Sequence, residues 1–93
     1  MSGIYHLIDQ QNGGTEHVHS IILTVDEARE SLAAELALHL LGGWKVRPIY
    51  DTTGLLTAVR MRHRREDGSV TERVVTFREF DQPVPGAVYP HEC

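Results

Sequence analysis

Hydrophobic positions in the middle of the chain repeat with the 3.6-residue period of an α-helix. The periodic positions are Val25, Ala28, Leu32, Leu36 and Leu40. Thr24 and Glu27 form a capping-box pattern, in which the Thr24 hydroxyl oxygen accepts the backbone N–H of Glu27 and the Glu27 carboxylate reaches back. Gly42 and Gly43 can take the left-handed backbone conformation that ends a helix. These features predict a helix over Val25–Leu41.

Short apolar runs bounded by turn residues predict strands on both sides of this helix. The predicted strands are Ile4–Asp9 and His17–Leu23 before the helix, and Trp44–Tyr50, Leu55–Arg65 and Ser69–Phe80 after it. Asn12-Gly13 between the first two strands is a strong hairpin pair. The order ββαβββ predicts an α+β, two-layer domain with one helix packed on one face of an antiparallel sheet.

The chain changes character after Asp81. It continues as Gln-Pro-Val-Pro-Gly-Ala-Val-Tyr-Pro, which is typical of an extended, polyproline-like segment rather than of a packed element. We therefore expect a single α+β domain over residues 1–81 and an extended Pro-rich tail over residues 82–93. The pattern shows no internal repeat and no second domain.

Turn lengths predict which residues lie opposite each other on the strands that follow the helix. A four-residue turn over Asp51–Gly54 places Tyr50 opposite Leu55, and therefore Val46 opposite Val59. This register gathers apolar side chains on one face of the sheet, where we expect the helix to pack.

The next hairpin allows two registers. A two-residue turn pairs Met61 with Val74, whereas a three-residue loop with Gly68 in the left-handed bulge position pairs Val59 with Val75. The second register aligns the apolar residues and is preferred. The face predicted to meet the helix then consists of Trp44, Val46, Tyr50, Leu55, Val59, Met61, Val75 and Phe77.

Strand alternation gathers cations on the opposite face. The run Arg60-Met61-Arg62-His63-Arg64 alternates cationic and other side chains, so its three arginines share one side of the strand. The predicted basic face consists of Lys45, Arg47, Arg60, Arg62, Arg64 and Arg78. Interleaved with these cations are Ile49, Leu56, Ala58, Val70, Glu72 and Val74.

Composition and charge make this face the main functional candidate. The chain has 93 residues, of which 41% are hydrophobic and 24% charged, as in an ordinary globular domain. The formal net charge is −4, but residues 1–43 carry one cation and six acids, whereas residues 44–80 carry eight cations and five acids. A basic half in an acidic chain indicates an anionic partner. Two complementary halves of one fold, or a dimer that pairs head to tail, would give the same asymmetry.

Three interpretations of the basic face follow from its chemistry. It can be a solvated surface with salt bridges, in which Glu72 lies across from Arg62. It can bind an acidic protein partner, because arginine forms paired hydrogen bonds with carboxylates. It can also bind nucleic acid or a nucleotide, although no exposed aromatic pair accompanies the arginines for base stacking.

Three histidines form a candidate metal site. His17 and His19 share one side of a strand, and a two-residue hairpin turn would place His6 opposite His19, so that three imidazoles could hold zinc. A three-residue turn would place Leu7 opposite His19 instead and dissolve the cluster. Further ligands could come from the end of the chain, at His91, Glu92 and Cys93.

The end of the predicted helix carries an apolar strip. Leu38 and Leu41 lie on the side opposite Leu32 and Leu36. Such a strip would pack against the N-terminal hairpin or the tail, or would form the seam of a homodimer.

Other sequence features limit the location and the chemistry. No apolar stretch is long enough to span a membrane, and the N-terminus lacks the regions of a signal peptide. The single cysteine cannot form an internal disulfide, which favours a reducing compartment, so we expect a cytoplasmic protein. The motifs of common enzyme classes are absent from the sequence, so we expect neither catalysis nor a cofactor.

Together these patterns favour a small non-catalytic domain of regulatory type, such as an adaptor or an inhibitor. Its basic face would bind an anionic partner, an acidic protein in the first place. The second hypothesis is a nucleic-acid or nucleotide binder that uses the same face. The third is a metal-binding protein built on the histidine cluster.

Overall fold

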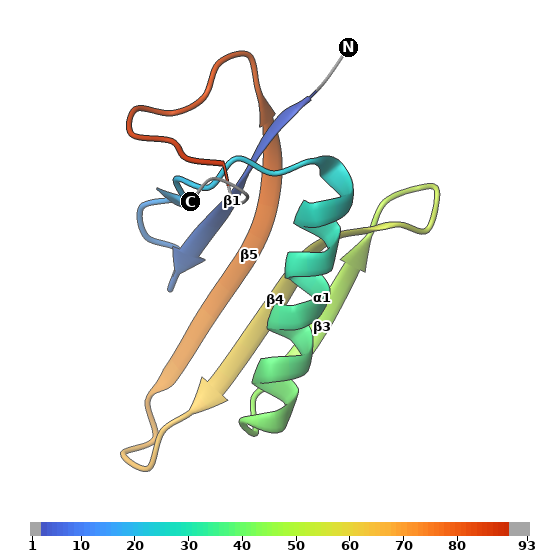
Figure 1. The fold of residues 1–93 in the computed structure, drawn as a ribbon. Coiled ribbons are helices and arrows are strands. Elements are labelled where there is room, and N and C mark those ends of the chain that lie inside the picture. The colour runs from blue at the N-terminus through green and yellow to red at the C-terminus, as the bar shows by residue number, and fades with distance from the viewer. Residues whose placement is uncertain (1–2, 90–93) are drawn as a thin grey trace.

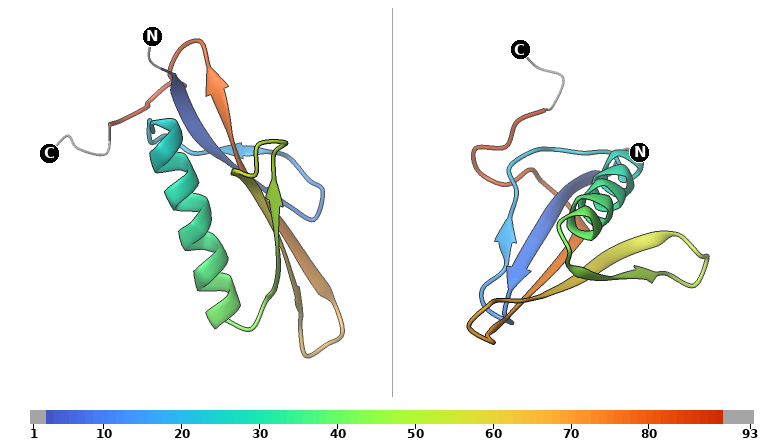
Figure 2. Two further views of the ribbon diagram at one scale, coloured as in Figure 1. Left: turned by 90° about the vertical axis from the view of Figure 1, so that its right-hand side faces the viewer. Right: turned by 90° about the horizontal axis from the view of Figure 1, so that it is seen from below.

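The computed structural model describes residues 3–89. Within them, one helix packs against a five-stranded antiparallel sheet with the strand order β2-β1-β5-β4-β3, which confirms the predicted α+β architecture. The elements are β1 (Ile4–Gln11), β2 (His17–Val18), α1 (Val25–Leu41), β3 (Lys45–Tyr50), β4 (Leu56–Arg64) and β5 (Val70–Phe80). Helix α1 lies over β4 and β3 in Figure 1, and Figure 2 shows it as a separate layer beside the sheet.

Helix α1 has the predicted bounds, and both ends are capped as expected. Thr24 Oγ1 accepts the backbone N–H of Glu27 at 3.1 Å, and the Glu27 carboxylate accepts the N–H of Thr24 at 2.9 Å. At the other end the N–H of Trp44 donates to the carbonyl of His39 at 2.9 Å, across Gly43 with a φ of 85°. This pattern is a Schellman motif, which satisfies carbonyls at the helix end. Among the described residues, no helical segment has the length and apolar character that crossing a bilayer requires.

Near the C-terminal end of α1, the residues that face the sheet differ from those predicted. Ala28 and Leu32 are fully buried, but Leu40, which was expected to continue the stripe, is 54% exposed. His39 faces the sheet instead, with its ring centroid 4.9 Å from that of Trp44. Because an α-helix has 3.6 residues per turn, steps of four residues rotate progressively away from the line of contact.

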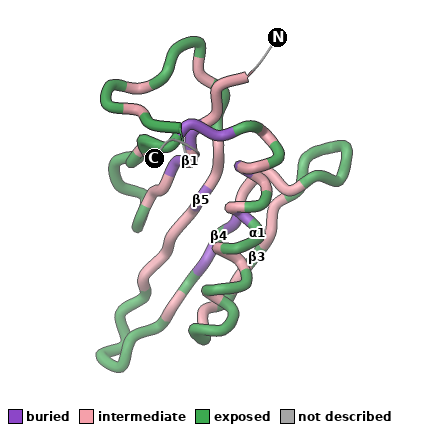
Figure 3. The backbone as a smooth tube through the Cα atoms, in the orientation of Figure 1, coloured by how far each residue is buried: buried purple, intermediate pink, exposed green. Residues whose placement is uncertain are grey.

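The hydrophobic core lies between α1 and the middle of β4 and β5 (Figure 3). Leu32, Val59, Met61 and Val75 are buried and form one contiguous cluster. Val59 lies opposite Val75, which is the register predicted from the three-residue loop. Gly68 in that loop has the positive φ, 87°, that the bulge position requires. The prediction for this hairpin is confirmed.

The pairing of β3 with β4 differs from the predicted register by two residues. Val46 lies opposite Met61 rather than Val59. The turn accounts for one residue, because the N–H of Asp51 donates to the carbonyl of Leu55 at 2.9 Å and closes a three-residue loop. A bulge further along the strands accounts for the other. Since side chains alternate with a period of two, a shift of two leaves the residues beyond the bulge on their predicted faces.

The same bulge changes the faces of the residues at the turn end of β4. Tyr50 and Leu55 were predicted to face the helix, but they are 57% and 47% exposed. Leu56 was predicted to lie on the opposite face, but it packs against the core. The extra residue lies in β4, because Ile49 pairs with Ala58 and Tyr50 with Leu56. It interrupts the alternation of β4, so the faces predicted for Leu55 and Leu56 are wrong. Tyr50 keeps its predicted face, opposite Leu56, but remains largely exposed.

The first hairpin has the three-residue turn, and its second strand is shorter than predicted. The N–H of His19 donates to the carbonyl of Leu7 at 2.8 Å, as expected for that turn. Strand β2 ends at Val18 instead of continuing to Leu23. The chain loops away after His19, and Leu23 then rejoins β1 opposite Tyr5.

The segment that loops away pairs with the C-terminal tail. Val88 donates its N–H to the carbonyl of Ser20 at 3.0 Å and accepts the N–H of Ile22 at 2.8 Å. The backbone N–H of Val84 lies 3.5 Å from Nε2 of His6, whose side chain is fully buried on the sheet face away from α1. The tail therefore covers part of the second face, and the expectation that it does not pack is wrong for its described part.

Substitution of one core leucine tests this placement of the core. Leu32→Ala should lower the free energy of unfolding by about 2–5 kcal/mol, because it leaves a cavity against the sheet. Leu38→Ala in the same helix, at a position that is 64% exposed, should change it by less than about 0.5 kcal/mol. Urea denaturation measures both values, and equal losses would contradict the described face of α1.

Candidate functional site

Five of the six predicted basic-face residues lie together on β3 and β4. Lys45 lies opposite Arg62, and Arg47 lies opposite Arg60. Arg64 follows Arg62 by two positions on β4 and therefore shares its face. All five residues are exposed. This set of five residues is termed the basic patch.

The basic patch carries more positive charge than the described structure neutralises. Arg62 Nε lies 3.6 Å from the carboxylate of Glu72, its neighbour on β5. The other four members form no ion pair with any residue of the described range 3–89. Like charges directly opposite each other on adjacent strands destabilise a sheet. The two cross-strand cation pairs therefore cost stability in the free protein.

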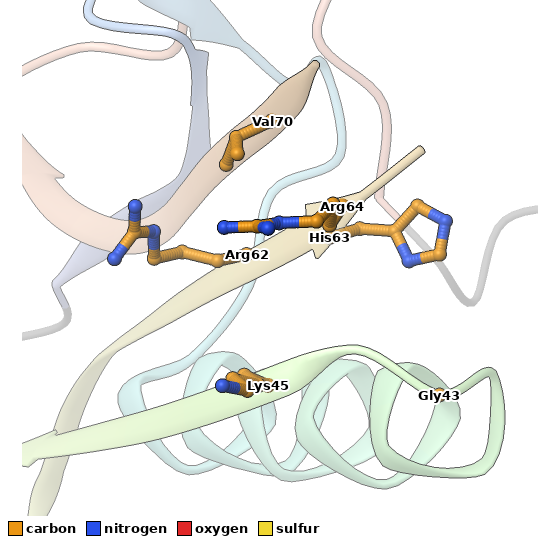
Figure 4. Close-up of a pocket in the computed structure, with 6 residues that line it drawn as sticks. All are labelled: Gly43, Lys45, Arg62, His63, Arg64 and Val70. Carbon is orange, nitrogen blue, oxygen red and sulfur yellow. The ribbon is translucent and has the colours of Figure 1, made fainter. Parts of the chain in front are cut away.

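Two open pockets lie on the basic patch. The larger has a volume of about 270 Å³ and is lined by Gly43, Lys45, Arg62, His63, Arg64 and Val70. The second, of about 200 Å³, shares Lys45 and Arg62 and is completed by Val46, Arg47, Arg60 and Glu72. In Figure 4 the side chains of Arg62 and Arg64 extend to one side of β4, whereas His63 points to the other side. The pockets thus offer several cationic N–H donors to a ligand at the surface.

The sixth predicted residue, Arg78, lies apart from the basic patch. Its neighbour on β1 is His6, and its Nη2 forms an ion pair with the Glu16 carboxylate at 3.2 Å. Along β5 it lies four residues beyond Val74, the neighbour of Arg60, which is about 13 Å of strand. The structure therefore brings together five of the predicted cations and leaves Arg78 outside the group.

The structure does not bring the three predicted metal-ligating histidines together. His17 lies opposite Asp9, and His6 is three positions from Asp9 on β1, so alternation sends the two histidines to different faces. The rings of His17 and His19 do meet, with centroids 5.6 Å apart. Within residues 3–89 no group of three potential metal ligands forms. The remaining candidates, His91, Glu92 and Cys93, lie outside the described residues.

His6 instead connects three parts of the fold. Its Nδ1 lies 2.8 Å from the carbonyl oxygen of His19, which can only accept, so Nδ1 carries the hydrogen. Nε2 is then free to accept the N–H of Val84 at 3.5 Å. The edge of Phe80 packs against the ring at a centroid distance of 5.0 Å. Through these contacts His6 holds β1, the loop after β2 and the tail together.

A second polar cluster, which was not anticipated from the sequence, lies between α1 and the sheet. Arg73 Nε on β5 lies 3.0 and 2.9 Å from the two carboxylate oxygens of Asp9 on β1. Arg73 Nη1 lies 3.5 Å from the Glu35 carboxylate and 3.1 Å from Nε2 of His39, both on α1. The four side chains are only 13–26% exposed. Two signals could have revealed the cluster: Arg73 shares a strand face with Val75, and Glu35 and His39 are four positions apart on a helix.

The side chains of this second polar cluster satisfy one another's hydrogen bonds, and its carboxylates offset the charge of Arg73. The pKa of Arg73 is raised, chiefly because the Asp9 carboxylate accepts its hydrogen bonds; burial opposes this effect, and the charges of Asp9 and Glu35 reinforce it. A guanidinium can only donate, so His39 accepts at Nε2 and its Nδ1 donates to the carbonyl of Glu35 at 2.8 Å. The cluster therefore joins β1, β5 and α1 through satisfied hydrogen bonds, which is a structural role.

The predicted oligomer contact is exposed at the end of α1. Leu38 is 64% and Leu41 is 86% exposed, and Leu40 adds to the same end. Neither the N-terminal hairpin nor the described part of the tail covers these side chains. A dimer seam stays a prediction.

Removal of one partner from the buried cluster tests its structural role. Asp9→Asn should lower the free energy of unfolding by about 1–3 kcal/mol, because Arg73 loses its charged acceptor while it remains half-buried. Glu16→Gln, which breaks the exposed pair with Arg78, should cost at most about 1 kcal/mol. In urea denaturation the double variant Asp9→Asn/Arg73→Gln should be less destabilised than the sum of the single variants, and strict additivity would contradict direct coupling.

Introducing charge into the apolar strip tests the dimer. The unsubstituted protein should have the mass of a dimer in light scattering, and the double variant Leu38→Glu/Leu41→Glu should have that of a monomer with unchanged circular dichroism. Ala33→Glu, at another exposed position of α1, serves as the control. A monomeric unsubstituted protein, or a dimeric double variant, would exclude this seam.

Comparison of the chain with protein-family models, with curated proteins and with solved structures finds no match. The chemistry of the basic patch itself is therefore the evidence for its function.

Proposed function

We propose that this chain is a small, non-catalytic regulatory domain whose basic patch binds an acidic protein partner. The observation that carries the proposal is the placement of cation opposite cation, Lys45 across from Arg62 and Arg47 across from Arg60. This arrangement costs folding stability. A partner that brings carboxylates between the paired cations would convert the repulsion into attraction.

The predominance of arginine in the basic patch suits carboxylate ligands. A guanidinium offers a planar set of donors that matches both oxygens of a carboxylate. Removing an arginine side chain from water also costs less free energy than removing a lysine side chain, because the guanidinium is more weakly hydrated. Of the five basic-patch residues, only Arg62 lies within ion-pair distance of an acidic side chain of residues 3–89. The remaining charges are available to steer an acidic partner into place and to increase its association rate.

The linings of the two pockets favour contact over catalysis. They contain cations, aliphatic side chains, a glycine, Glu72 and His63, and neither lining includes a serine, threonine or cysteine that could act as a hydroxyl or thiol nucleophile. The His63 ring is stacked on Trp44 with a centroid distance of 5.1 Å and an interplanar angle of 27°. His63 therefore takes part in packing, which weakens it as a general base.

The contact between Trp44 and His63 favours an acidic protein over nucleic acid as the partner. Trp44 packs against the core and against His63, so its ring is not available as a stacking platform for a base. An acidic protein segment needs no stacking platform and can bind through the cations of the basic patch alone.

A double variant tests this function and separates it from a structural role of the cations. Arg47→Gln/Arg60→Gln should weaken binding of a fluorescent polyglutamate peptide by about tenfold or more at moderate salt. The free energy of unfolding should stay constant or rise, because a repulsive pair is removed. Fluorescence anisotropy and urea denaturation measure the two quantities.

Arg78→Gln is the matched control, because it removes a cation of the same sheet face outside the basic patch. A loss of stability in the double variant would show that the cations serve folding. Equal effects of the control and the double variant would show that only net charge matters. Tighter binding of a DNA oligonucleotide of equal charge would replace the acidic protein with nucleic acid as the partner.

A further inference from the structure

We propose that the acidic partner binds as an extended segment that pairs with the outer edge of strand β3. The segment would extend the sheet by one strand and place alternate carboxylates over the basic patch. This inference rests on the proposed function and specifies how the partner is recognised. An open backbone edge and the positive charge beside it would recognise the segment together.

Strand β3 is the longer of the two sheet edges, and it is open. The strand order ends with β3, and no residue of the described range 3–89 pairs with its outer side. The opposite edge is formed by β2, which has only two residues, and the tail pairs with the segment that follows it. An open strand edge presents unpaired N–H and C=O groups to another extended chain.

The direction of the β3 backbone groups follows from one hydrogen bond at its end. Asp51 donates its N–H toward β4, to the carbonyl of Leu55. Backbone groups of successive residues point to alternate sides of an antiparallel strand, so those of Tyr50, Pro48 and Val46 point outward. Pro48 lacks an N–H, but this is the side on which a strand tolerates proline. The edge thus offers three carbonyl acceptors and the N–H groups of Val46 and Tyr50.

Side-chain alternation then specifies the sequence pattern of the bound segment. Residues beside Lys45 and Arg47 would point to the basic patch, and the residues between them would point to the face of Val46 and Pro48, which are half-buried. Opposite charges in directly neighbouring strand positions attract. The matching segment therefore alternates acidic and apolar residues, with its carboxylates at positions i and i+2.

Charge complementarity distinguishes this partner from a second copy of the same strand. Cations and proline on an edge strand are the usual protection against edge-to-edge association, and they would repel another β3. The same cations attract an acidic strand. Lys45 and Arg47 lie on the edge strand itself, with Arg62 and Arg60 directly behind them on β4. An added acidic strand would therefore meet two rows of positive charge.

Synthetic peptides test the mode of binding. A short peptide that alternates Glu and Val should bind the full chain at least about tenfold more tightly than a peptide of the same composition with its Glu and Val residues in separate blocks. N-methylation of the alternate amides that face β3 should abolish the binding. N-methylation of the other set of amides should leave it unchanged. Fluorescence anisotropy measures the affinities, and amide chemical shifts of β3 should change with the active peptides only.

The outcomes distinguish failure of docking at the β3 edge from failure of the basic patch as the binding site. Equal affinities of the two N-methylated peptides, or of the alternating and block peptides, would overturn docking at the edge. If the Arg47→Gln/Arg60→Gln variant still weakened binding in that case, the proposed function would stand. If no acidic peptide bound, or if that variant and Arg78→Gln had equal effects, both proposals would fail.

Discussion

The phase of strand β4 is the constraint on which the rest of the structure depends. Val59 and Met61 are buried with Leu32 of α1 and Val75 of β5. Because successive side chains point to opposite faces, this burial sends the three arginines of β4 to the other side of the sheet. Full burial of an apolar side chain contributes about 1.5–3 kcal/mol, whereas exposed like-charge contacts cost at most about 1 kcal/mol. The core therefore determines where the cations go.

Arginine side chains have different surroundings on the two faces of this sheet. Arg73 lies under α1, where Asp9 and Glu35 surround its guanidinium and His39 accepts one of its hydrogens. A half-buried cation needs such partners, because desolvation without them would be costly. Arg60 is exposed on the other face and forms no ion pair with any of residues 3–89. Water replaces the protein partners there, and the charge remains available for recognition.

The covering of the second sheet face explains why the candidate site lies near β3. At the β1 end, the tail and the loop after β2 enclose His6 and pair with each other through Val88. His6 and Ile8 of β1 are buried on that side. The β3 end receives no such cover from the described residues, so both its cationic face and its backbone edge are open. The fold thus separates a closed, structural end from an open end that suits a partner.

The sequence by itself determined the local elements of this protein, and the tertiary structure decided how they are aligned. The helix over Val25–Leu41 and the register of Val59 with Val75 could be predicted, because capping, periodicity and a glycine turn are local signals. Five cations of the candidate site followed from strand alternation alone. The bulge between β3 and β4, the cluster around Arg73 and the packing of the tail could not be predicted in this way. They depend on contacts between residues far apart in the chain, and a shift of one residue in a strand exchanges the side chains that face the core with those that face solvent.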